Sequence, residues 1–437
     1  MTGEVPAPQP PLRKGGPASP CLARRPRHAG RFTLDSEAEI RTLTPADLPI
    51  QPLAPATERP PLRILILMSR TGGGHLASAR ALEAEFRRQR PDVAVTIVDM
   101  LSDHLSFPFN QLPRTYDGLV SRFPRLWSAM WHGSARSRFG DHSSAIIRRL
   151  SHRHLARLIS ETAPDLVVSV HPLVNDLFVP VLAKVRPQTR YVTVVTDLGG
   201  IHPSWLHPKN SAVYLPTEQA VAGALARGLP RDRLHIHGLP VRAEFSQAPA
   251  ERSAARTSFG LDPERPVALV VGGGGGIGPI EAIVSELGTS LAAAGSDAQI
   301  VAVTAKNETL KRRIEALPAR VPITALGYVD RMSDLMQASD ILITKAGPGT
   351  IAEASIRALP MAIYGFIPGQ EAANVDHVVK AGAGLFEPAP ARLAARVATL
   401  LGPGRLELAA MAGAAKALGR EQATHAIVAS ILANQDA

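Results

Sequence analysis

The stretch ILITKAGPGTIAEASIRALPMAIYGFIPGQEAANVDH, residues 341–377, decides the fold of this chain. It predicts a short buried strand at 341–344, a tight loop through 346–349, a helix from 350 to about 358, and a second strand near 361–364. The loop lacks side chains where a ligand must come close. The helix after it points its unpaired amides and positive dipole end at the carboxyl edge of the strand. This strand, loop and helix unit therefore predicts a phosphate-binding site.

Glu353 lies one turn into the predicted helix. A carboxylate there can take the two hydroxyls of a ribose, but Thr350 and Glu353 also have the spacing of a capping box. The two interpretations are compatible, and spacing leaves both open. Amide and carboxylate groups also gather on the loop after the second strand, in Gln370, Glu371 and Asn374. Such groups suit sugar hydroxyls, although a Gln-Glu pair on a loop is more often solvated surface.

The blocks KAGPGTIAEA and FIPGQEAANV, in this order and spacing, resemble the donor half of the monogalactosyldiacylglycerol synthases of glycosyltransferase family 28. The resemblance implies UDP-galactose or UDP-glucose as the donor and diacylglycerol as the acceptor. It implies that Glu353 holds the ribose and that Gln370 and Glu371 hold the hexose, with Asn374 also on the donor side. The diphosphate would lie on the turn formed by Gly347, Pro348, Gly349 and Thr350.

Length and composition set the broad class of the protein. A chain of 437 residues exceeds the usual size of one core, which predicts two domains plus extra segments. Apolar residues make up 45% of the chain, but no apolar run reaches the roughly 18 residues of a spanning helix, so we expect no membrane crossing. The formal charge of +10 predicts affinity for an anionic partner. The single cysteine, Cys21, excludes a disulfide framework, makes thiol chemistry improbable and is consistent with a reducing cytoplasm.

Residues 1–61 are rich in Pro, Ala and Arg and lack a sustained apolar period, which predicts a disordered tail. No apolar core follows the first positive charges, so we do not expect a secretory signal. The arginines leave an organelle transit peptide open, although several acidic residues argue against it. A first, acceptor-binding domain is expected at 62–240.

The run LRILILM at 62–68 predicts a central strand, and SRTGGGH follows it before a helix from about 76 to 88. His75 would lie at the carboxyl edge of the sheet, where open α/β sheets bind ligands, and could act as a general base. A helix cap or a surface histidine is the plainer alternative. TGGGH also resembles the first motif of the same family, whose histidine lies between acceptor and donor. Gly73 and Gly74 then belong to the acceptor side, and Leu76 departs from the basic residue expected there.

Residues 100–142 break the α/β pattern and predict an insertion that mixes aromatic residues with arginines. The mixture suits a membrane interface with anionic phospholipids, where rings lie at headgroup depth and cations meet phosphates. A helical hairpin that packs its rings on the domain is the alternative, and the donor motifs argue against a nucleic-acid partner. The residues concerned are Phe107, Phe109, Tyr116, Phe123, Trp127, Trp131 and Phe139, with Arg114, Arg122, Arg125, Arg136 and Arg138.

Polar residues follow two further predicted strands of the first domain, at 165–170 and 190–196. His171 comes after the first strand. The segment after the second resembles the acceptor side of the family and holds Asp197, His202 and Trp205. Asp197 would orient His75 or a nearby histidine, or hold the acceptor hydroxyl, unless it only satisfies loop amides. The nearby histidines also suggest zinc, but their spacing fits no common ligand pattern, so we expect no metal.

The segment 241–262 is polar and irregular and predicts a linker. A UDP-sugar-binding domain would follow at 263–403, and helices at 404–437, one of which could cross back to the first domain. The strand at 267–271 leads into five glycines, of which Gly273 and Gly274 are candidates to approach the donor. The run is not a GxGxxG arrangement followed by a ribose-binding acid, so an NAD oxidoreductase is the weaker interpretation.

These features predict two Rossmann-like domains facing each other across a cleft, the GT-B arrangement. They also predict inverting transfer of a hexose from a UDP-sugar to diacylglycerol, with galactose as the favoured hexose. No cofactor is expected, because the UDP-sugar is a substrate. The alternatives are a diacylglycerol glucosyltransferase, processive or not, and a peptidoglycan-lipid N-acetylglucosaminyltransferase. Less favoured are a UDP-sugar epimerase and a non-catalytic nucleotide-sugar-binding membrane protein. We expect a peripheral protein on the cytoplasmic, inner face of the cell membrane.

Overall fold

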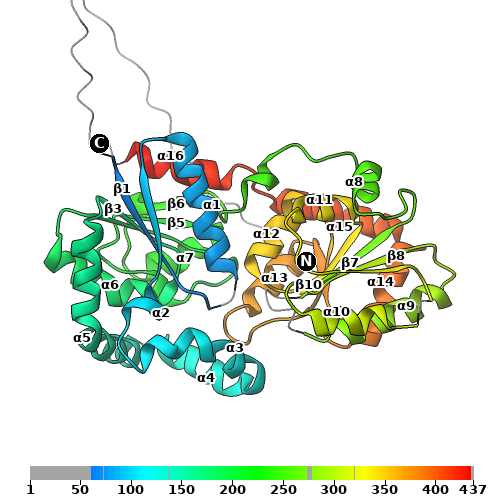
Figure 1. Cartoon of the computed structure of the whole chain (residues 1–437), viewed down its shortest axis with the longest axis horizontal. Helices are drawn as coiled ribbons and strands as arrows, with labels where there is room; N and C mark the ends of the chain where they lie inside the picture. Colours follow the sequence, from blue (N-terminus) through cyan, green and yellow to red (C-terminus); the bar gives the residue numbers. More distant parts are fainter. Residues whose placement is uncertain (1–60, 72, 136, 273–277, 319, 435–437) are drawn as a thin grey trace, which may run out of the picture. The chain divides into compact units, whose positions relative to one another are not determined.

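The computed structural model describes residues 61–434, except 72, 136, 273–277 and 319. Two six-stranded sheets, parallel throughout, form its framework (Figure 1). Their strand orders are β2-β1-β3-β4-β5-β6 and β12-β11-β10-β7-β8-β9. Helices pack on both faces of each sheet, which confirms the predicted pair of Rossmann-like domains. The predicted tail lies outside the described residues, apart from Pro61.

The first sheet is built from short, mostly apolar strands, as expected where both faces are covered. Its members are β1 (Arg63–Met68), β2 (Ala94–Asp99), β3 (Leu166–Ser169), β4 (Arg190–Val194), β5 (Ala212–Leu215) and β6 (Leu234–Ile236). Leu82 and Phe86 of α1 (Gly74–Gln89) cover one face. The other face packs on α5 (Ser137–Thr162) and α6 (Asn175–Val185). Because the strands are parallel, the loops after β1, β3 and β4 meet at one edge.

The second sheet repeats this plan. Its strands are β7 (Val267–Val271), β8 (Gln299–Val303), β9 (Ile323–Leu326), β10 (Ile341–Lys345), β11 (Met361–Gly365) and β12 (Gly384–Phe386). One face packs on α9 (Ile280–Ala293), α10 (Glu308–Glu315) and α14 (Pro390–Leu401). The opposite face packs on α11 (Met332–Ala338), α12 (Pro348–Ile356) and α13 (Ala372–Lys380). The predicted strand at 267–271 is confirmed residue for residue.

The predicted insertion is helical. It contains α2 (Met100–His104), the 3₁₀ turn η1 (Phe109–Gln111), α3 (Leu112–Arg122), α4 (Pro124–Ser134) and the start of α5. Pro113 and Pro124 lie in the first turns of α3 and α4, where a missing amide hydrogen costs nothing. The other short elements of this half are η2 (Pro172–Val174), η3 (Pro203–Trp205), α7 (Glu218–Ala226) and η4 (Arg231–Arg233).

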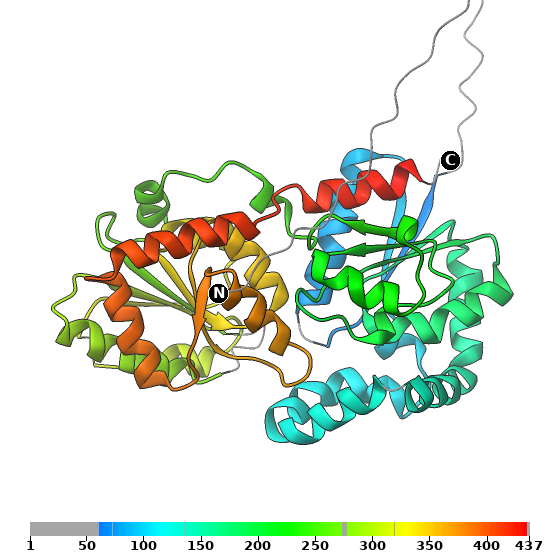
Figure 2. The ribbon, with the colours of Figure 1, turned by 180° about the vertical axis from the view of Figure 1, so that it is seen from behind.

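The C-terminal helix returns to the first sheet (Figures 1 and 2). The helices expected over 404–437 are α15 (Arg405–Leu418) and α16 (Ala423–Ala433), separated at Gly419. α15 packs on the second sheet, whereas Ile427 and Ile431 of α16 enter the core of the first. His425 also lies 2.9 Å from a carboxylate oxygen of Glu85 on α1. The last helix therefore completes a core that begins some 360 residues earlier in the sequence.

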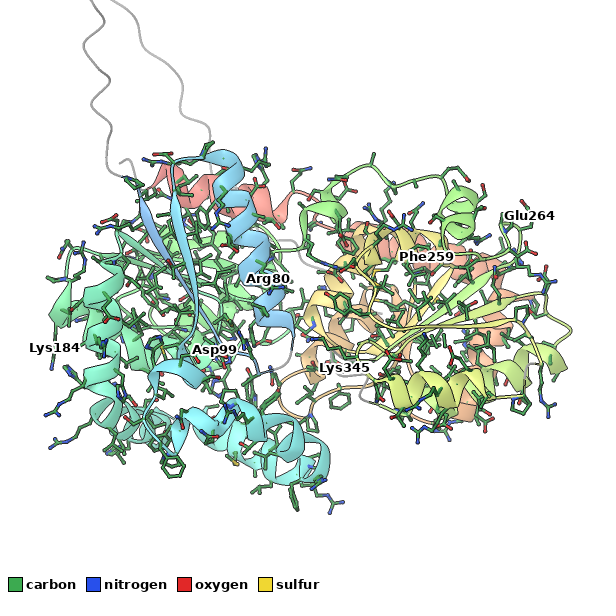
Figure 3. All side chains as sticks on the ribbon, in the orientation of Figure 1. Arg80, Asp99, Lys184, Phe259, Glu264 and Lys345 are labelled. Carbon is green, nitrogen blue, oxygen red and sulfur yellow. The ribbon has the colours of Figure 1, made fainter. Side chains whose placement is uncertain are left out.

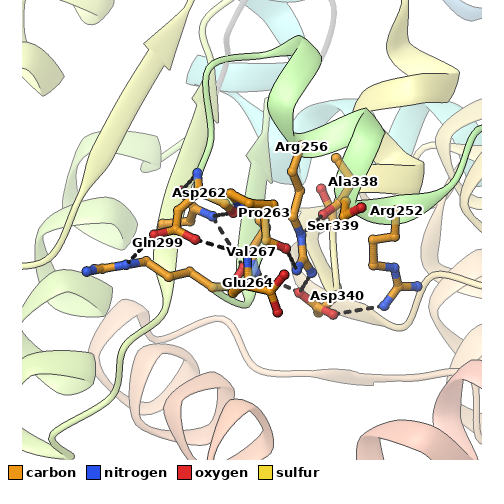
Figure 4. A network of polar contacts seen from close by, with 12 residues as sticks. Arg252, Arg256, Asp262, Pro263, Glu264, Val267, Gln299, Ala338, Ser339 and Asp340 are labelled. Atoms are coloured by element: carbon orange, nitrogen blue, oxygen red, sulfur yellow. Dashed lines mark hydrogen bonds and ion pairs between the residues drawn. The ribbon is translucent and has the colours of Figure 1, made fainter.

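A cluster of charges around Asp340 holds the segment between the sheets (Figure 4). This segment, predicted to be an irregular linker, contains η5 (Ala243–Ser246) and α8 (Arg252–Ser258). The Asp340 carboxylate accepts hydrogen bonds from Arg252 at 2.9 Å, from Arg256 at 2.8 Å and from the Val267 amide at 2.7 Å. Arg256 is buried, so loss of Asp340 would leave an uncompensated charge, which typically costs about 3–5 kcal/mol. The cluster therefore fixes α8 to the start of β7.

Candidate active site

The loop between β10 and α12 has groups that suit an anion. Gly347 is the N-cap of α12, and Pro348 and Gly349 are the first helical residues. A Cβ on Gly347 would lie 3.6 Å from Nζ of Lys345 and 3.9 Å from Oγ1 of Thr350, whereas a Cβ on Gly349 would meet nothing within 4 Å. An ammonium group, a hydroxyl and a helix amino end therefore border an open approach, which is the chemistry that binds phosphate.

Lys345 is a functional candidate that the sequence reasoning did not single out. It ends β10 and is labelled in Figure 3. Its Nζ lies 2.6 Å from Oε1 of Glu371, and Oε2 of the same carboxylate accepts the Ile367 amide hydrogen at 2.9 Å. Glu371 is buried, and its carboxylate holds both the Lys345 side chain and the backbone of the loop after β11. The signal available in the sequence was a lysine between an apolar strand and a glycine loop.

Glu353 does not belong to a capping box. The helix begins two residues earlier than predicted, its N-cap Gly347 has no side-chain cap, and Thr350 is its third residue. That interpretation is therefore wrong. Oε1 of Glu353 instead lies 3.2 Å from a terminal guanidinium nitrogen of Arg242. Burial raises the pKa of Glu353 to about 7, although the charge of Arg242 acts to lower it.

The predicted hexose residues make contacts with the first half of the chain. Oε1 of Gln370 accepts a hydrogen bond from the Tyr116 hydroxyl at 2.9 Å. Asn374 is completely buried; its Oδ1 accepts the Gly199 amide hydrogen at 3.1 Å, and its Nδ2 donates to the Ala346 carbonyl at 3.0 Å. Asn374 therefore joins the loop after β4 to the loop after β10, and both of its polar atoms are used.

His75 is buried at the start of α1, with its Nδ1 2.8 Å from the Val170 carbonyl oxygen and 3.1 Å from Oγ1 of Thr196. A carbonyl can only accept, so Nδ1 carries the proton and Nε2 has the free lone pair. Among the described residues, no hydrogen-bond partner occupies Nε2. Burial lowers the pKa of His75 to about 4, which keeps the ring neutral at physiological pH. The arrangement is that of a general base, fixed by a backbone carbonyl and a threonine.

His171 and Trp205 complete the surroundings of His75. The His171 ring lies edge-on at 4.6 Å from the His75 ring, and the Trp205 ring lies 6.2 Å away. Nε2 of His171 is 2.8 Å from Oγ1 of Thr71, whereas its buried Nδ1 has no partner within the described chain. Burial holds the pKa of His171 well below its usual value. Two neutral imidazoles thus lie together at the carboxyl edge of β1 and β3.

Asp197 does not serve as the carboxylate of His75, because Val170 and Thr196 already occupy Nδ1. Its Oδ2 accepts the indole hydrogen of Trp205 at 2.7 Å. Burial raises the pKa of Asp197 to about 7, and the nearby charge of Glu371 acts in the same direction. The structure therefore shows Asp197 holding Trp205, which in turn packs near His75.

Trp127 and Trp131 are half-buried rather than on the outer surface of the insertion. They form a row in which Tyr116 lies 5.1 Å from Trp127, Trp127 lies 6.1 Å from Trp131, and Trp131 lies 4.4 Å from His202, measured between ring centres. A Cβ on Gly369, whose φ is +83°, would come 2.7 Å from the Trp131 ring. The row therefore packs against the loop that carries Gln370. The packed-hairpin alternative describes these two indoles.

The remaining predicted residues have simpler positions. Gly73 and Gly74 are exposed, and a Cβ on either would meet nothing within 4 Å. Gly273 and Gly274 lie outside the described residues, as do the side chains of Arg136, Arg138 and Phe139. Within the described chain, no three His, Cys, Asp or Glu side chains gather as they would around a metal ion. No helix in that part has both the length and the apolar character to cross a bilayer.

Comparisons with known proteins find relatives for both halves of the chain. Residues 75–241 match the family model of monogalactosyldiacylglycerol (MGDG) synthase, and residues 267–425 match the glycosyltransferase family 28 C-terminal domain. A probable monogalactosyldiacylglycerol synthase, chloroplastic, from Glycine max is 39% identical over 374 residues, which cover 84% of this chain and 70% of that protein. Monogalactosyldiacylglycerol synthase 1, chloroplastic, from Arabidopsis thaliana is 37% identical over 377 residues, with the same shares covered.

Solved structures share the fold at low identity. MurG of Acinetobacter baumannii has a TM-score of 0.56 at 15% identity, over 85% of this chain and 99% of its own. A UDP-glucose:anthocyanidin 3-O-glucosyltransferase in complex with UDP has a TM-score of 0.55 at 11% identity, over 86% of this chain and 100% of its own. Identities this low concern the fold alone. The similarity to the synthases, by contrast, runs through both sheets, and the chain belongs to the monogalactosyldiacylglycerol synthase family.

Proposed function

We propose that the chain transfers galactose from UDP-galactose to the free hydroxyl of diacylglycerol, with inversion at the anomeric carbon. The observation that carries this proposal is His75, a buried neutral imidazole whose Nδ1 is fixed by the Val170 carbonyl and whose Nε2 can accept a proton. Transfer to a hydroxyl needs such a base. Family membership supports the donor and the acceptor, because the relatives are named for this product.

The donor would bind along the carboxyl edge of β10 and β11. Lys345, the amino end of α12 and the Thr350 hydroxyl offer charge and hydrogen bonds to the diphosphate. Glu353, one turn further, would accept hydrogen bonds from the ribose hydroxyls and share its carboxylate with Arg242. The hexose would then reach the loop after β11, where the Gln370 side chain is held by Tyr116.

The reaction is a direct displacement. The acceptor oxygen forms a bond to the anomeric carbon as the bond from that carbon to the diphosphate oxygen breaks, and the acceptor proton passes to Nε2 of His75. A positioned base of this kind contributes roughly 10²- to 10⁴-fold in rate. Lys345 and the α12 amides meet the negative charge that develops on the leaving UDP. Attack from the face opposite the leaving group inverts the sugar.

The acceptor is a membrane lipid, and the insertion offers a surface that suits one. Phe123, the N-cap residue of α4, and Leu126 and Met130 within the helix are spaced to lie on one side, and the three residues are 58%, 53% and 48% exposed. Arg122 and Arg125 are exposed beside them. Apolar side chains at this density favour the headgroup region, and the arginines favour anionic phospholipids. We therefore place peripheral membrane contact on this outer face of α4. We also predict that the protein lies on the cytoplasmic face of the cell membrane, which cell fractionation can test.

A turnover assay tests the activity. The protein is incubated with diacylglycerol vesicles and labelled UDP-galactose or UDP-glucose, and the lipids are then separated. We expect a monogalactolipid from the parent. His75→Ala should lose about 10²- to 10⁴-fold in kcat and bind UDP almost normally by calorimetry, whereas His152→Ala, an exposed histidine on α5, should resemble the parent. A glucolipid or a longer glycan would identify the related transferases, and UDP binding without any lipid product would overturn the proposal.

Vesicle binding tests the membrane surface separately. Replacing Phe123 and Leu126 with Ser should weaken binding to vesicles that contain phosphatidylglycerol, and added salt should weaken it further by screening the arginines. The matched control replaces the exposed Leu225 and Leu406, which lie outside the insertion, with Ser. Equal binding by the α4 variant and the control would contradict this placement.

A further inference from the structure

A cavity of about 360 Å³ lies in the first half of the chain, beneath the helical insertion. Its volume is within the range of small-molecule sites, roughly 300–1,000 Å³. The walls come from α2, the two ends of the insertion, α6, and the loops around η2 and η3. The lining residues that matter below are Leu101, Leu105, Leu112, Ala135, Ser144, Ile147, Leu173, Leu177, His202, Leu206 and Arg227.

Part of the cavity wall is apolar, and the rest is polar, with Asp176, His207 and Arg227 among the lining residues. Leu101, Leu105 and Leu177 are almost fully buried and belong to the core between the first sheet and its helices. Two other lining leucines keep large exposed fractions, 40% for Leu112 and 42% for Leu173. Exposed leucines on two elements, in the same cavity lining as buried leucines, offer an apolar entrance. Such a surface favours a hydrocarbon ligand.

Two of the polar side chains on the lining, His202 and Arg227, have partners inside the protein. Nδ1 of His202 lies 2.7 Å from Oγ of Ser204, and its Nε2 lies 3.2 Å from Oγ of Ser134. Burial lowers the pKa of His202 to about 4, so the ring carries no charge at neutral pH. Arg227 donates to the Ala135 carbonyl. His202 therefore offers no charge to a headgroup, and the leucine-rich part of the wall suits an uncharged chain.

The cavity lies close to the proposed base along the backbone. His171, whose ring lies 4.6 Å from that of His75, is separated from the lining residue Leu173 by one proline. Trp205, whose ring lies 6.2 Å from that of His75, is immediately followed by the lining residue Leu206. The η2 and η3 turns thus have residues near His75 and residues in the cavity wall. A lipid with its chain in the cavity would have its polar end within reach of these two turns.

We propose that this cavity binds one acyl chain of the acceptor lipid. The proposal rests on the proposed function, because an uncharged diacylglycerol is the acceptor with apolar chains and a free hydroxyl. Chain burial here would hold the glycerol near His75, and the second chain would stay at the membrane surface. The affinity of the protein for its acceptor would then depend on the acyl chain as well as on the glycerol hydroxyl.

Photolabelling tests the site without turnover. A diacylglycerol carrying a diazirine in one acyl chain is irradiated with the full-length parent in detergent micelles, and labelled peptides are mapped by mass spectrometry. We expect labels on the peptides that contain Leu105, Ile147 and Leu177. Excess dioleoylglycerol should compete them away. Labels confined to the outer face of α4, around Phe123 and Leu126, would overturn the proposal, because the chain would then stay in the lipid phase.

Filling the cavity tests it kinetically. Ala135→Phe and Ser144→Phe place a ring on two different walls, and Ala222→Phe places the same ring on an exposed position of α7 as the control. The filled variants should raise KM for dioleoylglycerol in mixed micelles on the order of tenfold, because the loss corresponds to roughly two buried methylene groups. The same variants should leave KM for dibutyrylglycerol unchanged. Equal changes for both lipids, or none, would overturn the inference. A parent that binds the photoprobe in the cavity but makes no galactolipid would instead count against the proposed function.

Discussion

The Tyr116 hydroxyl donates a 2.9 Å hydrogen bond to Oε1 of Gln370 and so joins the helical insertion to the loop predicted to hold the hexose. Trp131 packs on Gly369 of the same loop. The helix whose outer face we assign to the membrane therefore contacts the donor side with its inner face. The proposed membrane contact and the proposed donor site therefore share one structural element.

Tyr116→Phe should lower kcat/KM for UDP-galactose about fivefold, because one hydrogen bond worth roughly 1 kcal/mol no longer fixes the loop. Binding of UDP alone should stay unchanged, since UDP lacks the hexose. Tyr214→Phe is the matched control, because it removes a hydrogen bond to Ser430 on α16 instead. Equal losses in the two variants would show a general effect on stability and contradict the positioning role.

Lys345→Met should weaken UDP binding by about ten- to a hundredfold, the usual effect of losing a hydrogen bond to a charged group. The variant also leaves Glu371 buried without its cation, so the melting temperature should fall. The double variant Lys345→Met/Glu371→Gln removes that stranded charge. If it recovers the melting temperature and still binds UDP weakly, Lys345 contacts the phosphate; recovery of UDP binding would mean that Lys345 acts only through the fold. Lys380→Met, in an exposed pair, is the control.

Glu353→Gln should raise KM for the donor, with a loss of about 1.5–3 kcal/mol, because the amide is a weaker acceptor for the ribose hydroxyls. Arg242→Met removes the competing partner of the carboxylate and should leave UDP affinity equal or higher. Calorimetry with UDP compares the two variants directly. Parallel losses would place Arg242 on the nucleotide, and a lower melting temperature with unchanged KM would make Glu353 structural.

The pH dependence of turnover should differ between kcat/KM and kcat. Burial lowers the pKa of His75 to about 4 in the empty site, and the bound diphosphate, being negative, should raise it. The imidazole accepts a proton only when neutral, so activity falls as pH drops through each value. We expect the acidic limb of kcat/KM near pH 4 and that of kcat at higher pH. Coinciding limbs near the ordinary histidine value would contradict a buried base, and circular dichroism would control for unfolding.

Asp197→Asn should stabilise the protein at high pH. Burial raises the pKa of this carboxyl to about 7 in the folded state, well above its value in the unfolded chain. At pH values between these two pKa values, the folded chain therefore binds one proton that the unfolded chain has lost. Stability from this group is therefore present below the unfolded pKa and is lost as pH rises to about 7. Asparagine can still accept from Trp205 and has no charge to bury. Urea unfolding at pH 8 and pH 5 should show the gain mainly at pH 8; a loss at pH 8 would mean that the ionised form is held by an unseen partner.

Local sequence patterns predicted most of the framework because they depend on neighbours in the chain. The apolar run before Gly347 and the one before the glycines that precede His75 indicated two buried strands feeding ligand loops, and the structure has both. The position of His75 followed from the same rule. The predicted start of the helix was wrong by two residues. Pro348 is well suited to a first turn, but the capping pattern at Thr350 pointed to a later start.

Contacts between distant segments were not predictable in this way. Nothing near Glu353 in the sequence indicates Arg242, and nothing near Gln370 indicates Tyr116. Asp197 lies only 8 residues from its partner Trp205, but the path of the loop between them, not their spacing, decides that contact. An aromatic, arginine-rich composition also could not separate the half-buried Trp131 from the exposed Phe123, because composition does not show which side chains face the domain.

The return of α16 to the first sheet affects how the chain can be made. Ile427, Val428 and Ile431 fill the same apolar layer as Leu82 and Phe86 of α1. A ribosome adding roughly 5–20 residues per second would leave that layer exposed until the last helix emerges, after all strands of the second sheet have been made. The half that is synthesised first is therefore the half that closes last, and its unprotected strands are the ones that a chaperone would have to shield.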